Sequence, residues 1–410
     1  MSANTDRLDG RGGTITILDL PPNTLVGLDL LSFNSSPKFH GIKDVPTGPH
    51  FVYTGTDASL SIRHGCWIDV GGSTIDHVLR WNEHDEFLDI VTNAKAVALK
   101  AGPNLINYAA IQAATANLQT SEKSTQDDES RRENEPSNSD WAQLTEGIDS
   151  TTISRIIPST SITSISSAPA DAETIPGLVS SEVEAALPAN SHLNLIPINL
   201  KQTWAEGDIG SVRTERARDR SWYLDHIASN LGCSIRSIYP EGGPRVGYQE
   251  ILAELRFTFL MVLTLANYSC LEQWKRLLTL LFTSKSALSK MENYYIDVLQ
   301  TLALQLIHAD DVEGGLFELR EESGSGWLRS LMRKFRGFVE DELPDTGGTL
   351  RKELGRFEKM LNEQFGWESG NDWARRGTVQ LEDGEVIEVA LDDADEDEEA
   401  GDWAPVVVET

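Results

Sequence analysis

Residues 247–282 read GYQEILAELRFTFLMVLTLANYSCLEQWKRLLTLLF, and the segment 257–266 within them is apolar except for Thr258 and Thr264. A helix that is apolar all the way round has no face for solvent, so it is expected inside a helical bundle. A membrane span needs about 20 apolar residues, and charged residues flank this shorter run closely on both sides. The stretch therefore predicts the central helix of a helical domain.

Four further segments place apolar residues at helical spacing, which predicts amphipathic helices of the same domain. They are 222–231, 294–307, 328–338 and 350–365. The first is expected to end at Gly232, because glycine commonly occupies the residue after a helix. No fixed repeat length relates these segments, so they predict an irregular bundle or a short superhelix. The side chains expected on the buried stripes are Tyr295, Val298, Leu299, Leu302, Leu306, Leu328, Leu331, Phe335, Phe338, Leu350, Leu354, Phe357, Leu361 and Phe365.

The N-terminal part has a different pattern, in which short β-branched or aromatic segments alternate with turn residues such as Pro21-Pro22-Asn23. Because no helix-length crossover separates these segments, their spacing favours a small antiparallel sandwich or barrel over a parallel sheet. Residues 90–118 predict a helix interrupted at Gly102-Pro103, and residues 141–157 predict another helix packed on this domain. The expected strands are 14–20, 25–30, 39–45, 50–54, 59–63, 66–70 and 74–81.

The charge balance narrows the class of partner. The 410 residues include 35 basic and 64 acidic side chains, giving a net charge of -29. Such a chain repels nucleic acid phosphates and anionic lipids, so a basic protein partner is expected, with no direct nucleic acid or membrane contact. The N-terminus has no apolar leader segment, and the cysteines Cys66, Cys233 and Cys270 are odd in number and widely spaced. We therefore expect a soluble protein of a reducing compartment, and these features do not distinguish the cytoplasm from the nucleus.

Composition also sets the expected domain boundaries of this α+β chain. Residues 1–157 form a β-rich sandwich or barrel-like domain, and within it residues 119–140 have no large apolar side chain and predict a mobile acidic insertion. Residues 158–192 are rich in serine, threonine, alanine and proline, which is typical of a linker. Residues 193–370 form the all-helical domain, and residues 371–410 a flexible acidic tail that can form strands.

The tail has no lysine or arginine from Gly377 onward. Residues 378–391 predict a hairpin with Asp383-Gly384 as a two-residue turn, and 392–399 form an acidic block. A lone hairpin is marginally stable in water, so it is expected to pair with a sheet edge in this molecule or in another. The candidate partner-binding residues are Val379, Leu381, Val386, Ile387, Val389, Leu391 and Trp403.

No grouping of residues indicates catalysis, a metal or a cofactor. The five histidines of the β-rich half match no metal-ligand spacing, and Cys66 has no defined helper that would make it a nucleophile. A hydrolase using Cys66 or a histidine is the weakest of the functions considered. The histidines concerned are His40, His50, His64, His77 and His84.

Two clusters of basic residues and one pair of hydroxyl residues are considered as sites for RNA binding and for phosphorylation, respectively. The basic clusters, within 213–220 and 329–336, are interleaved with or followed by acidic residues and favour an ordinary helix surface over an RNA site. Ser124 and Thr125 precede acidic residues in the insertion, a context in which phosphorylation would alter docking by charge.

Residues 26–52, VGLDLLSFNSSPKFHGIKDVPTGPHFV, carry a more specific signal. They resemble the signature of the A1-cistron splicing factor family, which are assembly factors of the U5 small nuclear ribonucleoprotein (snRNP). That signature is G-x-D, then P-K-F-x-G-[IV]-K, then P-x-G-x-H-F. Looser matches follow at 65–67, 78–81, 141–157, 254–257 and 272–278. The matching signature residues are Gly27, Asp29, Pro37, Lys38, Phe39, Gly41, Ile42, Lys43, Pro46, Gly48, His50 and Phe51.

The resemblance implies a β-rich domain joined to a helical domain related to VHS superhelices. It also implies a chaperone-like function, not an enzymatic one: binding the large U5 scaffold protein through its RNase H-like and Jab/MPN-like domains, and blocking premature binding of other partners. Family members add their C-terminal tail as a strand to the partner, which the tail here would permit. The alternative function is a VHS-like peptide-binding adaptor in membrane traffic.

Overall fold

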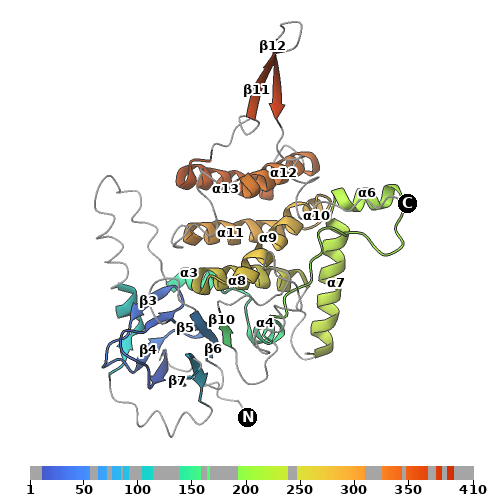
Figure 1. Cartoon of the computed structure of the whole chain (residues 1–410). Coiled ribbons are helices and arrows are strands. Elements are labelled where there is room, and N and C mark those ends of the chain that lie inside the picture. Colours follow the sequence, from blue (N-terminus) through green and yellow to red (C-terminus); the bar gives the residue numbers. More distant parts are fainter. Residues whose placement is uncertain are drawn as a thin grey trace, which may run out of the picture. The chain divides into compact units, whose positions relative to one another are not determined.

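The computed structural model describes residues 12–55, 63–71, 76–84, 86–91, 104–113, 138–157, 164–166, 193–238, 247–309, 326–343, 348–367, 375–380 and 386–391. The chain forms two compact units, whose elements are labelled in Figure 1. Unit 1 comprises Met1–Leu195 and Arg256–Glu272, and unit 2 comprises Ile196–Leu255 and Gln273–Thr410. The predicted combination of a β-rich N-terminal region and a helical C-terminal region is confirmed. The predicted linker lies largely outside the described residues, and the predicted domain boundaries stay a prediction.

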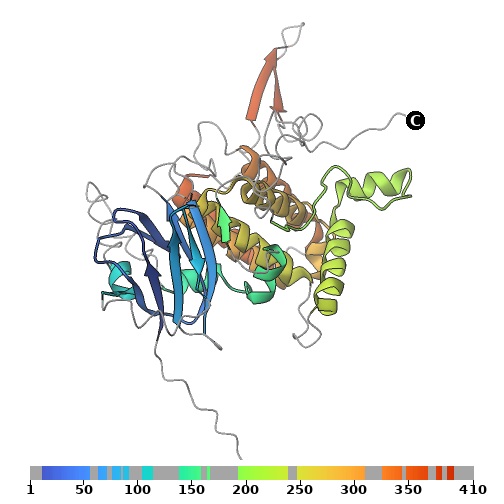
Figure 2. The same cartoon turned by 60° about the horizontal axis from the view of Figure 1, so that its bottom comes forward.

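Unit 1 contains two five-stranded sheets, drawn as blue arrows in Figure 2. Side chains from both sheets form one hydrophobic core, which includes Ile15, Val26 and Ile42. The first sheet has the order β8-β7-β1-β4-β9 and consists of β1 (Gly13–Leu18), β4 (Gly41–Val45), β7 (Asp76–Asn82), β8 (Phe87–Ile90) and β9 (Ile106–Asn107). The second has the order β10-β6-β5-β2-β3 and consists of β2 (Leu25–Leu28), β3 (Leu31–Asn34), β5 (Gly48–Gly55), β6 (Arg63–Val70) and β10 (Ser164–Ser166).

The prediction of a purely antiparallel sandwich is wrong for two strand pairs. β1 pairs with β7 in parallel, with Thr14 opposite Asp76, and β4 pairs with β9 in parallel, with Ile42 opposite Ile106. A parallel pair needs a long crossover, which the prediction expected to be a helix. Here the crossover from β1 to β7 instead runs through strands of both sheets, including β2, β5 and β6.

Several predicted segments of unit 1 are shortened or divided in the structure. The strand expected at 25–30 stops at Leu28, because Asp29 adopts a left-handed backbone (φ 60°) and turns the chain into β3. The helix expected at 141–157 is two helices, α3 (Asn138–Leu144) and α4 (Ser150–Ile156). The carboxylate of Asp149 accepts hydrogen bonds from the Thr151 and Thr152 amides, which starts α4 as a separate helix. The helix expected at 90–118 lies partly outside the described residues, and its described part contains β9 followed by a helical segment at 108–113.

The remaining helices confirm the predicted helical region. They are α6 (Ser211–Arg218), α7 (Ser221–Ile238), α8 (Gly247–Leu265), α9 (Tyr268–Phe282), α10 (Ala287–Lys290), α11 (Glu292–Ala309), α12 (Gly326–Glu342) and α13 (Thr349–Phe365). The predicted stripes of α11, α12 and α13 are buried except for Phe338 and Phe365, which are partly exposed. None of the helices in the described residues has the length and apolar content that a bilayer crossing requires.

Helix α8 is the predicted central helix, and every residue from 250 to 262 is buried. The apolar stretch does not continue as one helix, because Ala266 has a left-handed backbone (φ 53°). Asn267 then accepts a hydrogen bond from the Cys270 amide through its side chain and starts α9.

The two ends of α8 belong to different units and make different contacts. In unit 2, Glu254 accepts hydrogen bonds of 2.8 Å from the Ile196 amide and from the side chain of Gln273. In unit 1, the ring of Phe257 stacks on that of Trp67 at 5.7 Å, and Arg256 donates to the Glu146 carbonyl at 2.6 Å. Helix α8 is therefore buried at its Glu254 end in unit 2 and at its Phe257 end in unit 1.

The predicted end of a helix at Gly232 is wrong, because α7 continues to Ile238. A Cβ atom at Gly232 would meet only the backbone nitrogen of Gly247, at 3.6 Å. Glycine inside a helix costs about 1 kcal/mol relative to alanine but does not end it.

The tail forms the predicted hairpin from β11 (Arg375–Gln380) and β12 (Val386–Leu391). The strands are antiparallel, with Val379 opposite Ile387 and Gln380 opposite Val386. The predicted two-residue turn at Asp383-Gly384 lies outside the described residues.

Leu260→Asp is expected to abolish cooperative unfolding of the chain, because it buries an unpaired carboxylate at a fully buried position of α8. Thermal unfolding followed by circular dichroism measures this. Lys352→Asp, at an exposed position of α13, is the control and should melt within a few degrees of the wild type. A cooperative transition of Leu260→Asp near the wild-type temperature would contradict the assignment of α8 as the core helix.

Candidate functional site

The signature residues of 26–52 converge on the buried carboxylate of Asp29, which is 1% exposed. Its Oδ1 accepts a hydrogen bond from the Phe51 amide at 3.0 Å. Its Oδ2 accepts from Nδ1 of His50 at 2.6 Å and from the hydroxyl of Tyr108 at 2.9 Å. One carboxylate thus holds together the turn after β2, strand β5 and the segment 104–113.

His50 is positively charged in this arrangement. Its Nδ1 faces the carboxylate of Asp29, and its Nε2 lies 2.8 Å from the carbonyl oxygen of Pro46, which can only accept. Both ring nitrogens must therefore donate. Burial lowers the pKa of His50, but the charge of Asp29 and the hydrogen bonds to Asp29 and Pro46 outweigh burial and raise that pKa above 6.5.

Two signature glycines are required by close packing. A Cβ atom at Gly27 would lie 1.9 Å from the ring of Tyr53, and one at Gly41 would lie 2.1 Å from the Ile15 carbonyl oxygen. Gly41 also has a φ of 142°, which other residues rarely adopt. Phe39 and Ile42 are core residues. The signature is therefore mainly a folding constraint, and of its side chains Pro37, Lys38 and Lys43 are exposed.

A pocket of about 280 Å³ adjoins this network. It is lined by the turn 46–49, by His50 and Tyr108, and by residues between Trp141 and Ile148. The indole nitrogen of Trp141 donates to the Pro49 carbonyl at 2.9 Å, which fixes one wall. His50 and Tyr108 both donate to Asp29 and are almost fully buried, so this acid–base cluster stabilises the fold and is not disposed to act on a substrate.

The other chemical candidates lie apart from one another. Cys66 is buried, and burial raises its pKa to about 12, so it remains a protonated thiol and is unsuited to nucleophilic attack. Burial also lowers the pKa of His64. Within the described ranges, no group of three or more metal-ligating side chains is positioned to hold an ion.

The two basic clusters have local partners. Arg220 is buried and donates to the Thr283 hydroxyl at 2.9 Å. Arg329 lies over the ring of Trp367, and Arg336 pairs with Glu340 on the next helical turn. These contacts give Arg220, Arg329 and Arg336 roles within the fold and favour those roles over an RNA site.

The tail candidates are only partly described. Leu381 and Trp403 lie outside the described residues, as do Ser124 and Thr125. By strand alternation, the register places positions 379, 387, 389 and 391 on one face of the hairpin and position 386 on the other. The apolar residues of the prediction therefore gather mainly on one face, while their role in binding stays a prediction.

Tyr108 is the member of the Asp29 network that the sequence did not indicate. It lies 79 residues from Asp29, and a single tyrosine in an alanine-rich segment gives no signal of a distant partner.

Asp29→Asn is expected to destabilise unit 1 by about 3 kcal/mol, because the buried imidazolium of His50 loses its counter-ion. Urea unfolding measures this. Asp19→Asn is a matched control, since Asp19 has the same left-handed backbone (φ 60°) but an exposed carboxylate, paired with Arg80. The control should change stability by less than about 1 kcal/mol. Equal effects of the two substitutions would contradict the network.

The ion pair also sets a pH dependence. The folded pKa of His50 is raised above the unfolded value of 6.5, so its stabilisation is complete below pH 6.5 and is lost as the pH rises through the folded pKa. The difference in unfolding free energy between wild type and His50→Gln should therefore shrink from pH 6 to pH 9. A difference that stays constant or grows would contradict the charged state. His84→Gln, at an exposed position, is the control.

Known protein families match both parts of the chain. The family model described as "AAR2 N-terminal domain" matches residues 11–158, and the model described as "AAR2 C-terminal repeat region" matches residues 195–370. Protein AAR2 homolog of Mus musculus is 27% identical over 416 aligned positions, covering 92% of this chain and 96% of that protein. Protein AAR2 homolog of Homo sapiens is 26% identical over 392 positions, covering 88% and 91% respectively. The two models together span well over half of the sequence, and this chain belongs to the AAR2 family, the A1-cistron splicing factors whose signature residues 26–52 carry.

Proposed function

We propose that this chain is a non-enzymatic assembly factor of the U5 snRNP in pre-mRNA splicing. It binds the RNase H-like and Jab/MPN-like domains of the large U5 scaffold protein and blocks premature binding of other spliceosomal proteins. Membership of the AAR2 family supports the coarser part, a role in U5 snRNP assembly. We place this activity in the cytoplasm and nucleus, without direct contact to nucleic acid or membrane.

The observation that carries the proposal is the tail hairpin. β11 and β12 form a sheet of only two strands, and neither outer edge is paired to another described strand. An unpaired edge offers backbone amides and carbonyls to a partner strand, and pockets for alternate side chains then give specificity. The positions 379, 387, 389 and 391 would supply these side chains, because they share one face.

The state of the candidate catalytic side chains in unit 1 agrees with a binding function. Cys66 is held as a protonated thiol, and the donors of His50 and Tyr108 are directed to Asp29. Among the described residues, these candidate side chains are engaged in the fold, which supports action by occupying surfaces of a partner.

Deleting 377–410 is expected to weaken capture of the scaffold's RNase H-like domain at least tenfold, without lowering the melting temperature of either unit. Within the hairpin, Val389→Glu should weaken capture more than Gln380→Glu. Both substitutions add one negative charge, but they fall on opposite faces by register. Calorimetric titration of the purified full chain measures these affinities. Unchanged affinity of the deletion variant would remove the tail from the mechanism.

Phosphorylation at Ser124 or Thr125 is a proposed means of changing docking by added charge. Mass spectrometry of the protein from cells tests it, and an unmodified segment would count against it.

A further inference from the structure

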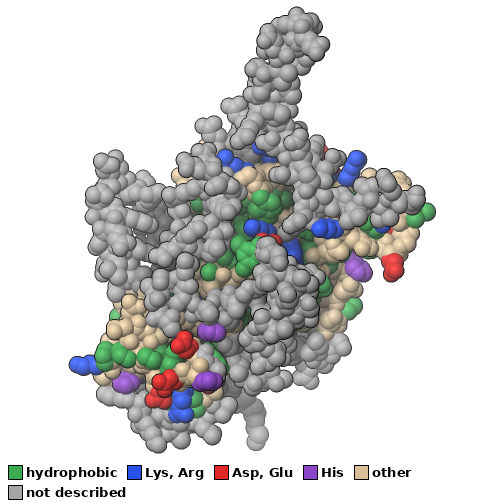
Figure 3. All heavy atoms as spheres, in the orientation of Figure 1, with side chains coloured by type: hydrophobic (Ala, Val, Ile, Leu, Met, Phe, Trp, Pro, Cys, Tyr) green, Lys and Arg blue, Asp and Glu red, His purple; other side chains and the backbone are tan. Residues whose placement is uncertain are grey.

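Helix α6 carries an exposed apolar and basic surface, which we call the α6 surface and define by Trp204, Ile209, Val212, Arg213 and Arg218. Among the large hydrophobic side chains that the structure describes, Ile209 is the most exposed, at 80%, and Val212 is 42% exposed. The helix itself buries none of its residues. In Figure 3, hydrophobic side chains (green) reach the molecular surface at the outer end of this helix, at the right of the view. A helix that contributes nothing to a core needs another reason for its apolar side chains.

The arginines of this helix are ordered by aromatic rings. The guanidinium carbon of Arg213 lies 4.6 Å above the Trp204 ring, and that of Arg216 lies 4.0 Å above the Trp222 ring. Arg216 also pairs with the carboxylate of Asp208. Cations held over indoles lose little side-chain freedom on binding, and tryptophan and arginine are enriched among residues that dominate interface energies.

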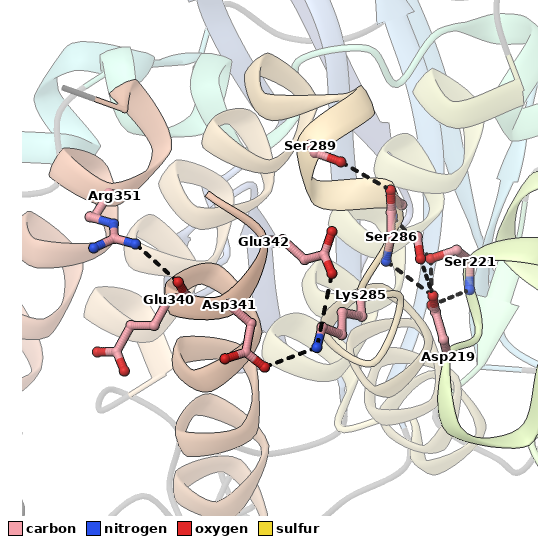
Figure 4. Close-up of polar contacts among 10 residues, drawn as sticks. Asp219, Ser221, Lys285, Ser286, Ser289, Glu340, Asp341, Glu342 and Arg351 are labelled. Carbon is pink, nitrogen blue, oxygen red and sulfur yellow. Dashed lines mark hydrogen bonds and ion pairs between the residues drawn. The ribbon is translucent and has the colours of Figure 1, made fainter. Parts of the chain in front are cut away.

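The C-terminal end of α6 is held firmly, although the sides of the helix are exposed. Asp219, at its C-terminus, accepts hydrogen bonds from the backbone amides of Ser221 and Ser286 and from both hydroxyls, as Figure 4 shows. Burial alone raises the pKa of Asp219, but these hydrogen bonds outweigh it and lower that pKa. The Thr203 hydroxyl donates to the Arg216 carbonyl at 2.8 Å. The α6 surface is therefore preorganised, which reduces the entropic cost of binding a ligand.

Charge indicates the class of ligand. Helix α6 has three arginines and one glutamate, on a chain whose net charge is -29. An acidic segment with apolar residues would complement it. The chain itself contains such a segment: residues 377–410 include 13 acidic and no basic residues, and the acidic block 392–399 is followed by Trp403.

Chain geometry permits the contact. Trp367 is buried in unit 2, and Arg375 pairs with Leu391 at the base of the hairpin. The seven residues 368–374 can span up to about 25 Å, and the block 392–399 can span a similar length beyond the hairpin base. A domain of this size has a radius of gyration of about 16 Å. Tethering at this range gives an effective concentration of about millimolar, so weak contacts suffice.

We infer that the α6 surface binds the acidic block 392–399 and the following Trp403 of the same chain. The arginines pair with the carboxylates, and Ile209 and Val212 receive the apolar residues. A regulatory role for this docking rests on the proposed function. While the tail is bound to the α6 surface it cannot bind the scaffold protein, so the scaffold protein must displace it.

The test uses a labelled synthetic peptide of residues 392–410 and the chain ending at Leu391, with binding followed by fluorescence anisotropy. The doubly substituted variant Arg213→Glu, Arg218→Glu should weaken binding at least tenfold, and Ile209→Ser several-fold. Arg356→Glu, an exposed position of α13 that also loses one arginine, is the control and should bind within twofold of the unsubstituted chain. Added salt should weaken binding.

The full chain should bind the labelled peptide at least tenfold more weakly than the truncated chain, because its own tail occupies the surface. Absence of peptide binding overturns the inference. Equal peptide binding by the unsubstituted chain and by the double variant Arg213→Glu, Arg218→Glu also overturns it. Equal binding by the full and truncated chains also overturns it, as does a dimer held by the tail in size-exclusion chromatography, which would assign the surface to a second copy.

Capture of the RNase H-like domain separates this inference from the proposed function. The full-length arginine variant should capture that domain more strongly than the wild type, because its tail is released. If neither the wild type nor any variant captures the RNase H-like domain, the proposed function is wrong. The peptide-binding result still shows whether the tail binds the α6 surface.

Discussion

Burial of α8 on every side is the constraint on which the rest of the structure depends. A helix with no polar face is stable only if other elements cover it completely, and residues 250–262 are all buried. The two ends of the helix satisfy this requirement in different units: Glu254 receives the Ile196 amide in unit 2, while Phe257 stacks on Trp67 in unit 1. Both the fold of the β-rich unit and that of the helical unit therefore include this one segment.

The Asp29 network has the same role on a smaller scale. Its carboxylate uses both oxygens to bind His50, Phe51 and Tyr108, which come from segments far apart in the sequence. Such a buried ion pair stabilises only when all its members are present, because any removal leaves a charge or a donor unpaired. The family signature is therefore explained mainly by folding.

The elements that the sequence predicted well are those whose signal is local. The buried run of α8, the stripes of α11 to α13 and the tail hairpin each follow from a periodicity within one segment. The failures depend on distant partners or on single backbone angles. The parallel pairing of β1 with β7 requires a crossover through other strands, and the break at Ala266 depends on one left-handed residue. For the candidate site, the signature located Asp29 and His50 but not Tyr108, because hydrogen bonding across 79 residues leaves no pattern in the sequence.

We propose that the chain acts by adding a tail strand to a partner protein, while the acid–base groups of the Asp29 network serve the fold. Amide hydrogen exchange of the full chain with and without the scaffold's RNase H-like domain tests this most directly. We expect slower exchange at the backbone amides of β11 and β12 that face the outer edges of the hairpin when the domain is present, because edge amides gain hydrogen-bond partners. Unchanged exchange throughout 375–380 and 386–391, with the domain bound elsewhere, would contradict it.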